Sequence, residues 1–504
     1  MRLKNILFSA SLLLGCLSTT AAGERLVILH TNDTHSQIDP DDRDRGGILR
    51  RKVLIDSVRG VEPNVLLVDA GDAVQGTLFF SLFNGEVERK MMNNLGYDMQ
   101  ILGNHEFDNG MDLLAKEWKQ LSADLLASNY DFTGSPMDGV TRPFVIRKYG
   151  DRTFGFIAIN IDPKGIIDDK KSKGTRYLDG VKMANRYASI LKEDYGVDMI
   201  IALTHIGYDG TNGYNDMKLA SLTRNIDVII GGHSHTTIDP DSPTVPDYKF
   251  VNLDGDTVLL TQTGSRGVNL GEVVVDLETM RPSSRLIPVD SRLDKNIDAK
   301  AAEILKPYRA AIDSIQSMVI GECVEEFVHG DIGLVNLVTD FVYDEAHRMM
   351  PGSHIDLCIM NRGGIRCGIP VGPITQGRIM MMLPFDNRLQ ILDIKGSDLI
   401  EALEIHTGRE GEGVSKGLSV KRKHGKKPES TFYIDGERVD PERIYRVATI
   451  DYLADGGDYL TPLKRGKKIA ISDDVLYELF IRYFSEGPLK GKPIRPDNEW
   501  RVKL

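Results

Sequence analysis

The chain has 504 residues, 41% hydrophobic and 27% charged, and its 62 lysines and arginines are outnumbered by 73 aspartates and glutamates for a net charge of −11. Because a domain usually holds about 100–200 residues, this length predicts two large domains, and the apolar share excludes a disordered chain. No apolar run beyond the first residues approaches the roughly 20 residues of a membrane helix, and the acidic balance argues against a protein that coats nucleic acid.

The first 22 residues have the layout of an export signal. Two basic residues precede the apolar stretch 6–17, and small residues follow it. This layout predicts a signal peptide over residues 1–22 and a protein exported to the periplasm or the cell surface. A second interpretation stays open, because residues 13–16 resemble a bacterial lipoprotein box. A lipid on Cys16 would then be the protein's membrane contact.

In the first half, five short apolar runs alternate with helical stretches, which predicts buried strands of a layered α/β fold. Each run ends in Asp, Asn or His, and glycine accompanies three of these ends. The polar ends are, in chain order, His30-Thr-Asn-Asp33-Thr-His35, Asp69-Ala-Gly-Asp72, Gly103-Asn-His105-Glu-Phe-Asp108, Thr204-His205 and Gly231-Gly-His-Ser-His235. Because α/β sheets place ligands at the carboxyl ends of their strands, we expect these side chains to converge.

Taken singly, these residues have structural explanations: a lone histidine is more often a hydrogen-bonded core residue, and Asp72 could be a helix N-cap. Five such ends in succession favour a binding site. A mixed set of carboxylates, amide and imidazoles suits two divalent cations such as Zn or Mn. Two cations about 4 Å apart can hold a bridging hydroxide and clamp the oxygens of a phosphoryl group.

The second half begins with a helical stretch over 296–320, interrupted at Pro307, in the position of a linker. Another helical run covers about 334–349, and short strands follow. Three polar and aromatic segments stand out, at 361–366, 383–387 and 451–459. Singly, a Gly-Gly pair with flanking arginine is typical of a turn, and Phe385 and Tyr452 are typical of a core.

Three cysteines follow the predicted signal and cannot all pair. A Cys358–Cys367 bridge is open, but small buried residues are the favoured interpretation. The basic run over 421–427 is predicted to be a solvated loop.

The strand ends of the first half resemble, in order, those of the calcineurin-like metallophosphoesterases, and above all the secreted bacterial 5′-nucleotidases. The three segments of the second half resemble the nucleotide-binding domain of that family, so the resemblance covers essentially the whole mature chain. It implies a metallophosphoesterase domain over 23–295, a four-layer β-sandwich flanked by helices. A linker helix over 296–320 and an α/β nucleotide-binding domain over 321–504 would follow.

The resemblance also implies the roles of individual residues. One metal would be bound by Asp33, His35 and His235, the other by Asn104, His205 and His233, with Asp72 bridging; the catalytic dyad would be His105 and Asp108. In the second domain, Phe385 and Tyr452 would stack on the base, Asp458 would bind the ribose, and Asn361 and Arg366 would contact the nucleotide. Glu106 stays outside the catalytic set as a supporting or structural carboxylate.

The chain departs from the family pattern at three places. Some relatives carry Gln at the position of His235. Residues 329–331 read His-Gly-Asp where the family usually has a phosphate-binding arginine, and Arg362 is a hypothetical substitute. Tyr459 stands where Gly is usual, so the ribose loop could sit differently.

These features predict an exported phosphomonoesterase that acts on nucleoside 5′-monophosphates by in-line attack of a metal-bridging hydroxide. A UDP-sugar or 2′,3′-cyclic-nucleotide phosphodiesterase would use the same metals. A sulfur-ester hydrolase is a more distant alternative, against which the two aromatic residues argue. A non-catalytic surface binding protein would have lost ligands, whereas every matched position is filled.

Overall fold

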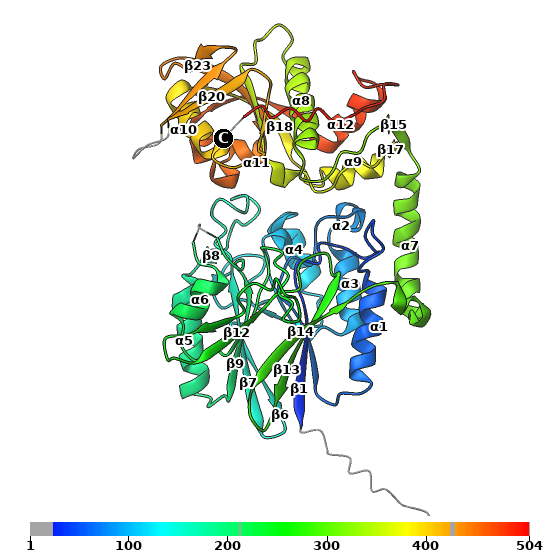
Figure 1. The fold of residues 1–504 in the computed structure, drawn as a ribbon, viewed down its shortest axis with the longest axis vertical. Helices are drawn as coiled ribbons and strands as arrows, with labels where there is room; N and C mark the ends of the chain where they lie inside the picture. The colour runs from blue at the N-terminus through cyan, green and yellow to red at the C-terminus, as the bar shows by residue number, and fades with distance from the viewer. Residues whose placement is uncertain (1–23, 211–212, 424–428, 503–504) are drawn as a thin grey trace, which may run out of the picture.

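A computed structural model describes residues 24–210, 213–423 and 429–502, so the predicted signal peptide with Cys16 lies outside the described residues, as does part of the basic run. The chain forms two units, one above the other in Figure 1, joined along one side by helix α7 (Ala299–Gln316). Within the described ranges, no helix is both long and apolar enough to cross a membrane.

The N-terminal unit is built on two six-stranded sheets that pack face to face. Their shared core consists of nearly inaccessible strand residues such as Ile28, Val68, Phe156 and Ile201. In order, the first sheet contains β14 (Pro282–Pro288), β13 (Asn269–Asp276), β1 (Arg25–Thr31), β2 (Val65–Asp69), β3 (Met99–Ile101) and β4 (Asp124–Leu126). The second contains β11 (Lys249–Val251), β12 (Thr257–Thr261), β10 (Val228–Ile230), β9 (Met199–His205), β7 (Arg152–Asn160) and β6 (Phe144–Tyr149).

The central strands of both sheets are parallel. In the first sheet β1, β2, β3 and β4 pair in parallel, and in the second β7, β9, β10 and β12 do. All seven residues of β9 are buried, as expected for a strand covered on both faces. Because parallel strands end at the same edge of a sheet, the five polar strand ends all lie at the edge that faces the C-terminal unit (Figure 1).

Helices cover the outer face of each sheet and complete four layers. On the first sheet pack α1 (Ile48–Arg59), α3 (Glu86–Leu95) and α7, and on the second α5 (Gly180–Glu193) and α6 (Asp216–Leu222). Two shorter helices, α2 (Leu78–Phe83) and α4 (Gly110–Trp118), and the strand pair β5 (Tyr130–Asp131) and β8 (Arg176–Tyr177) lie beside the sandwich. The predicted four-layer sandwich is confirmed.

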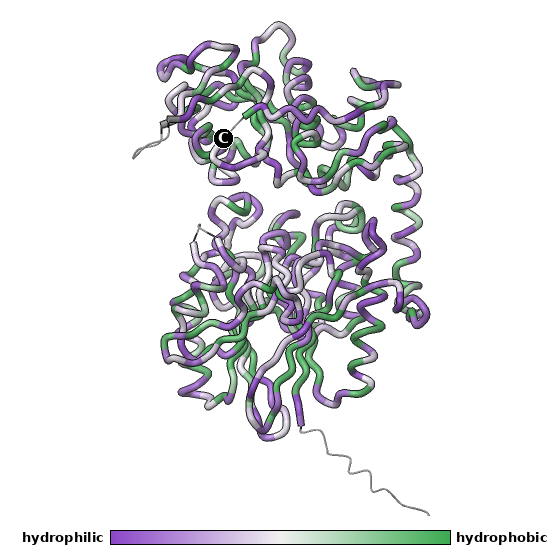
Figure 2. Tube along the Cα trace, in the orientation of Figure 1, coloured by the Kyte–Doolittle hydropathy of each residue, from purple (hydrophilic) through white to green (hydrophobic). Residues whose placement is uncertain are grey.

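The C-terminal unit has one hydrophobic core around a five-stranded sheet. In order, the sheet contains β19 (Gly413–Val414), β16 (Leu357–Met360), β23 (Ile444–Ile450), β18 (Arg388–Lys395) and β24 (Lys467–Val475). The accompanying helices are α8 (Ile332–Met349), α9 (Gln376–Met382), α10 (Gly396–Thr407), α11 (Asp451–Ala454) and α12 (Leu476–Ser485). Smaller sheets are formed by β15 (Val319–Cys323) with β17 (Gly372–Thr375), and by β20 (Leu418–Lys423), β21 (Glu429–Ile434) and β22 (Glu437–Arg438). Figure 2 shows hydrophobic segments along the inner strands of both units.

Helix α7 lies within the predicted stretch, but the interruption expected at Pro307 was wrong. The helix begins after Asp298, whose carboxylate accepts from the backbone N–H of Lys300, and runs through Pro307 without a break. Pro307 is exposed, so the carbonyl of Glu303 that loses its amide partner lies on the solvent side. Leu305 and other buried residues of α7 pack against the first sheet's helices, which supplies the packing that holds the helix together.

All three described cysteines, Cys323, Cys358 and Cys367, are free. The alternative of a Cys358–Cys367 bridge was therefore wrong. The first two are buried, as the favoured interpretation predicted.

Candidate active site

The loops that follow three of the five strands, β1, β2 and β10, contain a concentration of left-handed backbone. Asp33, His35, Asp72, His233 and His235 have φ angles of 49°, 47°, 54°, 78° and 56°. Outside glycine this conformation is uncommon, and such strain costs on the order of 1–3 kcal/mol at each position. Five of the seven predicted metal ligands are therefore held in an unfavourable conformation by the strands around them, a pattern that clusters at binding and catalytic sites.

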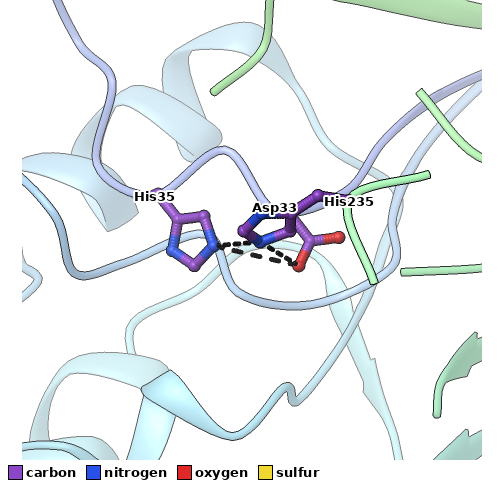
Figure 3. Close-up of side chains that lie close together, drawn as sticks. All are labelled: Asp33, His35 and His235. Atoms are coloured by element: carbon purple, nitrogen blue, oxygen red, sulfur yellow. Dashed lines mark hydrogen bonds and ion pairs between the residues drawn. The ribbon is translucent and has the colours of Figure 1, made fainter. Parts of the chain in front are cut away.

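Asp33, His35 and His235 form one cluster, in which the three side chains face one another (Figure 3). Nε2 of His35 lies 2.8 Å from Nε2 of His235, and Oδ1 of Asp33 lies 3.4 Å from Nε2 of His235. Asp33 is inaccessible to solvent, and burial holds the pKa of His35 well below its ordinary value. His35 is therefore neutral, which is the form of imidazole that binds a metal.

Asp72, His205 and His233 form a second cluster, and Asn104 adjoins it. Oδ2 of Asp72 lies 3.1 Å from Nε2 of His205, and Oδ1 of Asn104 lies 2.9 Å from Nδ1 of His233. Burial lowers the pKa of His233 to about 4. Burial alone would also lower the pKa of His205, but the carboxylate of Asp72 raises it to about 10.

The second cluster fits a divalent cation. Nδ1 of His205 is 2.8 Å from the carbonyl oxygen of Ala70, which orients the ring so that Nε2 faces Asp72. That Nε2 is buried and has no hydrogen-bond partner of acceptable geometry among the described residues. The second cluster thus offers imidazole nitrogens from His205 and His233, a carboxylate from Asp72 and an amide oxygen from Asn104. Zn and Mn accept all of these as ligands.

Asp72 lies within reach of both clusters. Its carboxylate also belongs to a group with His35 and His105, in which all ligand atoms lie within 4.8 Å of one another. The clusters adjoin, because the carboxylate of Asp33 accepts the backbone N–H of His233 at 2.9 Å. The structure thus brings all seven predicted metal ligands together.

The predicted dyad is formed as well. His105 and Asp108 belong to a 3₁₀ turn and its end, and Nδ1 of His105 lies 2.8 Å from Oδ2 of Asp108. The backbone N–H of His105 donates to Oδ1 of Asp72 at 2.8 Å, so the dyad is tied to the second cluster. This pairing can orient the imidazole toward a reacting group.

Glu106 supports the backbone beside the dyad. Its buried carboxylate accepts the N–H groups of Asp72, Ala73 and Gly103 at 3.0, 2.8 and 2.6 Å. Burial raises the pKa of Glu106 to about 8. These contacts are structural and explain a carboxylate in this motif without a catalytic role.

The five predicted substrate residues line one cavity with the candidate catalytic residues, although they come from different units. From the C-terminal unit the lining includes Asn361, Arg366, Phe385, Tyr452 and Asp458, and from the N-terminal unit Asn104, His105, Asp108 and His233. Within it, Asn361 Nδ2 donates to Asp458 at 2.7 Å and the Tyr452 hydroxyl donates to Asp458 at 3.1 Å. The carboxylate of Asp458 is therefore held in place by its neighbours.

Phe385 stacks on His105 across the interface. Their ring centroids are 5.9 Å apart and the planes meet at 24°. Phe385 and Tyr452 both line the cavity, which is where the predicted base stacking would place them. In this structure the Phe385 ring contacts His105 of the other unit.

Tyr459 stands where the resembled family usually has glycine, and its backbone is left-handed with φ of 62°, like that of its neighbour Asp458 with φ of 50°. The substitution therefore keeps a backbone conformation that glycine would adopt more easily. Its ring packs against Gly165 of the other unit.

A loop between β7 and β8 also lines the cavity, and the sequence analysis missed it. Ile166, Ile167, Asp168 and Lys171 belong to the lining. The Tyr452 hydroxyl contacts the carbonyl oxygen of Ile166 at 3.4 Å, although 286 residues separate them. No motif marks this loop, because its role depends on a contact with a segment far away in the chain.

Comparison with known proteins agrees with this geometry. Residues 26–237 match the family model of the calcineurin-like phosphoesterases, and residues 317–465 match that of the 5′-nucleotidase C-terminal domain. The chain is 30% identical to a snake venom 5′-nucleotidase of Gloydius brevicauda, over 89% of this chain and 84% of that protein. It is 29% identical to human 5′-nucleotidase, over 98% of this chain and 93% of the human protein.

Among solved structures, the crystal structure of a 5′-nucleotidase precursor from Thermus thermophilus superposes with a TM-score of 0.83. That protein is 28% identical and the match covers 95% of this chain and 99% of the other. Both units are thus matched, in sequence or in structure, by 5′-nucleotidases. The chain belongs to the 5′-nucleotidase family and is a metal-dependent phosphoesterase hydrolase.

Proposed function

We propose that the protein removes phosphate from nucleoside 5′-monophosphates at a centre of two divalent cations, Zn, Mn or similar. The observation that supports this most directly is the single cavity shared by Phe385, Tyr452 and Asp458 with His105 and His233. Such a cavity suits a ligand with an aromatic base at one end and a phosphate at the other.

Asp33, His35 and His235 would hold one cation, Asn104, His205 and His233 the other, and Asp72 would contact both. When bound, the cations supply Lewis-acid stabilisation of the phosphoryl oxygens and an activated water.

Around that centre, the chain's own side chains would bind and orient the substrate. His105, oriented by Asp108, would donate to a phosphoryl oxygen as negative charge develops on it. Arg366 would contact the phosphate from the C-terminal unit, and Asn361 the nucleoside. The base would stack between Phe385 and Tyr452, and stacking tolerates different bases because each has a π-face.

The domain organisation belongs to the same proposal. We place the catalytic domain at 23–295, the linker helix at 296–320 and the substrate-binding domain at 321–504. The signal peptide at 1–22 would direct the enzyme to the periplasm or the cell surface, with lipidation of Cys16 as the alternative fate of that segment.

A hydrolysis panel tests this function. The purified protein is stripped of metal, resupplied with Zn or Mn, and assayed on AMP, UDP-glucose, 2′,3′-cAMP and p-nitrophenyl phosphate. We expect AMP to give the highest kcat/KM and the stripped protein to be inactive. As a control, the Asp72→Asn variant should lose all four activities, and substantial residual turnover would sink the assignment of Asp72 to both cations.

The panel also tests a phosphodiesterase as the second candidate. A further cavity is lined by His35 and His235 of the first cluster and by Arg266 and Arg366. It gives room for a second substituent on phosphorus. A higher kcat/KM for UDP-glucose or 2′,3′-cAMP than for AMP would favour this candidate.

A further inference from the structure

Arg266 is anchored to the first metal-ligand cluster through its backbone. It lies in the loop between β12 and β13 of the N-terminal unit, and its N–H donates to the carbonyl oxygen of Asp33 at 2.7 Å. Its φ of 57° places it in the left-handed region, where an arginine is uncommon. The loop thus holds Arg266 in a strained conformation next to the candidate ligands, as is frequent for functional residues.

The side chain of Arg266 reaches across to the C-terminal unit. Its Nη2 donates to the carbonyl oxygen of Arg366 at 3.1 Å. No other hydrogen bond or ion pair of this guanidinium is found in the part of the chain that the structure describes. Because a guanidinium has five N–H donors, most of them remain available to a ligand.

Arg266 and Arg366 line the same cavity, together with His35 and His235 of the first cluster. Arg366 also lines the cavity that contains Phe385 and Tyr452, the residues proposed to bind the nucleoside. Two guanidiniums from two units therefore converge beside the cluster. This is the arrangement that recognises a phosphate, since a guanidinium can bind two of its oxygens at once.

The segment 329–331, where the resembled family usually has a phosphate-binding arginine, borders this cavity through His329 and Gly330. Gly330 belongs to its lining, so the departure in the sequence leaves that part of the lining without a guanidinium. Arg362, the substitute that the sequence suggested, also lines the cavity, but its Nη1 lies beside Gly411 of its own unit. Its backbone N–H donates to the carboxylate of Glu412 at 2.7 Å, in the same unit.

We propose that Arg266 binds the substrate's phosphate from the metal-binding unit and replaces the arginine absent at Gly330. The inference rests on the proposed function only in placing a phosphate at the clusters. Because Arg266 moves with the metal ligands and bonds to the backbone of Arg366, the phosphate site is complete only when the two units are together.

The test compares three variants. Arg266→Ala removes the guanidinium, and Arg266→Lys keeps a charge but loses the planar fork. Arg45→Ala is the matched control, because Arg45 lines the same cavity but is bound to Asp41 at 2.8 Å. Binding of inorganic phosphate and of adenosine is measured by calorimetry on metal-loaded protein, beside kcat/KM for AMP and p-nitrophenyl phosphate.

We expect Arg266→Ala to weaken phosphate binding about tenfold or more, with adenosine binding unchanged and both kcat/KM values reduced alike. Arg266→Lys should fall in between, and it carries the test if the alanine variant does not fold. The proposal is overturned if Arg266→Ala binds phosphate as Arg45→Ala does, or if adenosine binding falls equally. A wild-type protein that hydrolyses no nucleotide but shows the phosphate effect would refute the proposed function and leave the role of Arg266 intact.

Discussion

At the scale of single residues, the candidate site depends on side chains that the backbone holds in unfavourable conformations. His233 and His235 follow a buried strand and both have positive φ. Glycines at 231 and 232 precede them, and a Cβ on Gly232 would lie within 3.0 Å of Asp33, His205 and the backbone of Ala70. The absence of a side chain at Gly232 is therefore what lets both clusters adjoin.

His105 lies within 4.8 Å of Asp72 and His35 through its ring nitrogen, yet the proposed function gives it a role in catalysis and none as a ligand. We expect His105→Ala to lower kcat for AMP by about 10²–10⁴-fold, the usual effect of losing a positioned proton donor, while the protein keeps its metal. Metal content by mass spectrometry, beside steady-state kinetics, checks this. If the variant loses one equivalent of metal, His105 is a ligand and the dyad assignment is wrong.

Glu88, in α3, should give the fold a pH dependence unrelated to catalysis. It is 2% exposed and accepts a hydrogen bond from Ser36, and burial raises its pKa from 4.5 to about 7. The folded state therefore keeps a proton that the unfolded chain releases. The free energy of unfolding should fall as pH rises from about 4.5 to 7, by about 3 kcal/mol in all.

Urea unfolding of the metal-free protein at pH 5 and pH 8 measures this effect. Glu88→Gln, which cannot ionise, should flatten the dependence. Glu303→Gln serves as the control, because Glu303 is exposed on α7 and 70% of its side chain is accessible. An equal pH dependence in the wild type and Glu88→Gln would show that Glu88 is ionised in the folded protein.

At the scale of elements, the β7–β8 loop is the feature whose importance could not be seen in the sequence. Gly165 has φ of 79°, and a Cβ there would lie 2.9 Å from the ring of Tyr459. The loop can approach the C-terminal unit this closely because Gly165 has no side chain.

We expect Gly165→Ala to raise KM for AMP several-fold and to change KM for p-nitrophenyl phosphate little, because the loop lines the nucleoside end of the cavity. Gly134→Ala isolates the backbone effect, since Gly134 has a similar φ of 78° and no atom within 4 Å of the added methyl. Steady-state kinetics of both variants on both substrates decides the point. Equal changes in the two variants would attribute the effect to backbone strain.

Helix α7 connects the two units and packs on both, through α3 of the first and α9 of the second. Pro307 lies on its exposed face, and the helix continues there because packing of Leu305 and Ile312 outweighs one lost hydrogen bond. The tendency of a helix to end or break at proline is a local preference. In α7 tertiary packing outweighs that preference, and the helix continues through Pro307.

At the scale of the whole molecule, the cavity beside the metal-ligand clusters is lined by residues of both units. Two ion pairs join the β7–β8 loop to the C-terminal unit, Lys170 to Asp455 at 2.8 Å and Asp169 to Lys464 at 3.0 Å. The side chains of Lys170 and Asp169 are largely exposed, so each pair contributes at most about 1 kcal/mol and is screened by salt.

Because the β7–β8 loop also lines the cavity, reversing the charge of Asp169 should weaken substrate binding moderately. Asp169→Lys should raise KM for AMP by about twofold to fivefold at low salt, and the added Lys464→Asp change should restore it. The difference should shrink at about 0.5 M salt, where charges are screened within a few ångströms. Kinetics of the single and double variants at two salt concentrations test this, and a double variant no better than the single one would contradict it.

The sequence by itself predicted a layered α/β fold with five strand ends rich in Asp, Asn and His, and the family resemblance implied the four layers and the roles of the seven candidate ligands. Each ligand follows a buried strand, and the carboxyl ends of parallel strands meet at one edge whatever the details of the loops. The pairing of His105 with Asp108 was also implied by the resemblance, and both residues lie in one short motif. Local order along the chain was enough to place these side chains at the ends of strands.

Only the tertiary structure added further residues to the cavities beside those that the sequence had singled out. Arg266, Ile166 and Lys171 lie in loops without a motif, and they reach the site because the C-terminal unit packs over the metal-ligand edge. The stacking of Phe385 on His105 has the same origin. Contacts between segments hundreds of residues apart depend on how two separate cores are placed, and no local pattern encodes that placement.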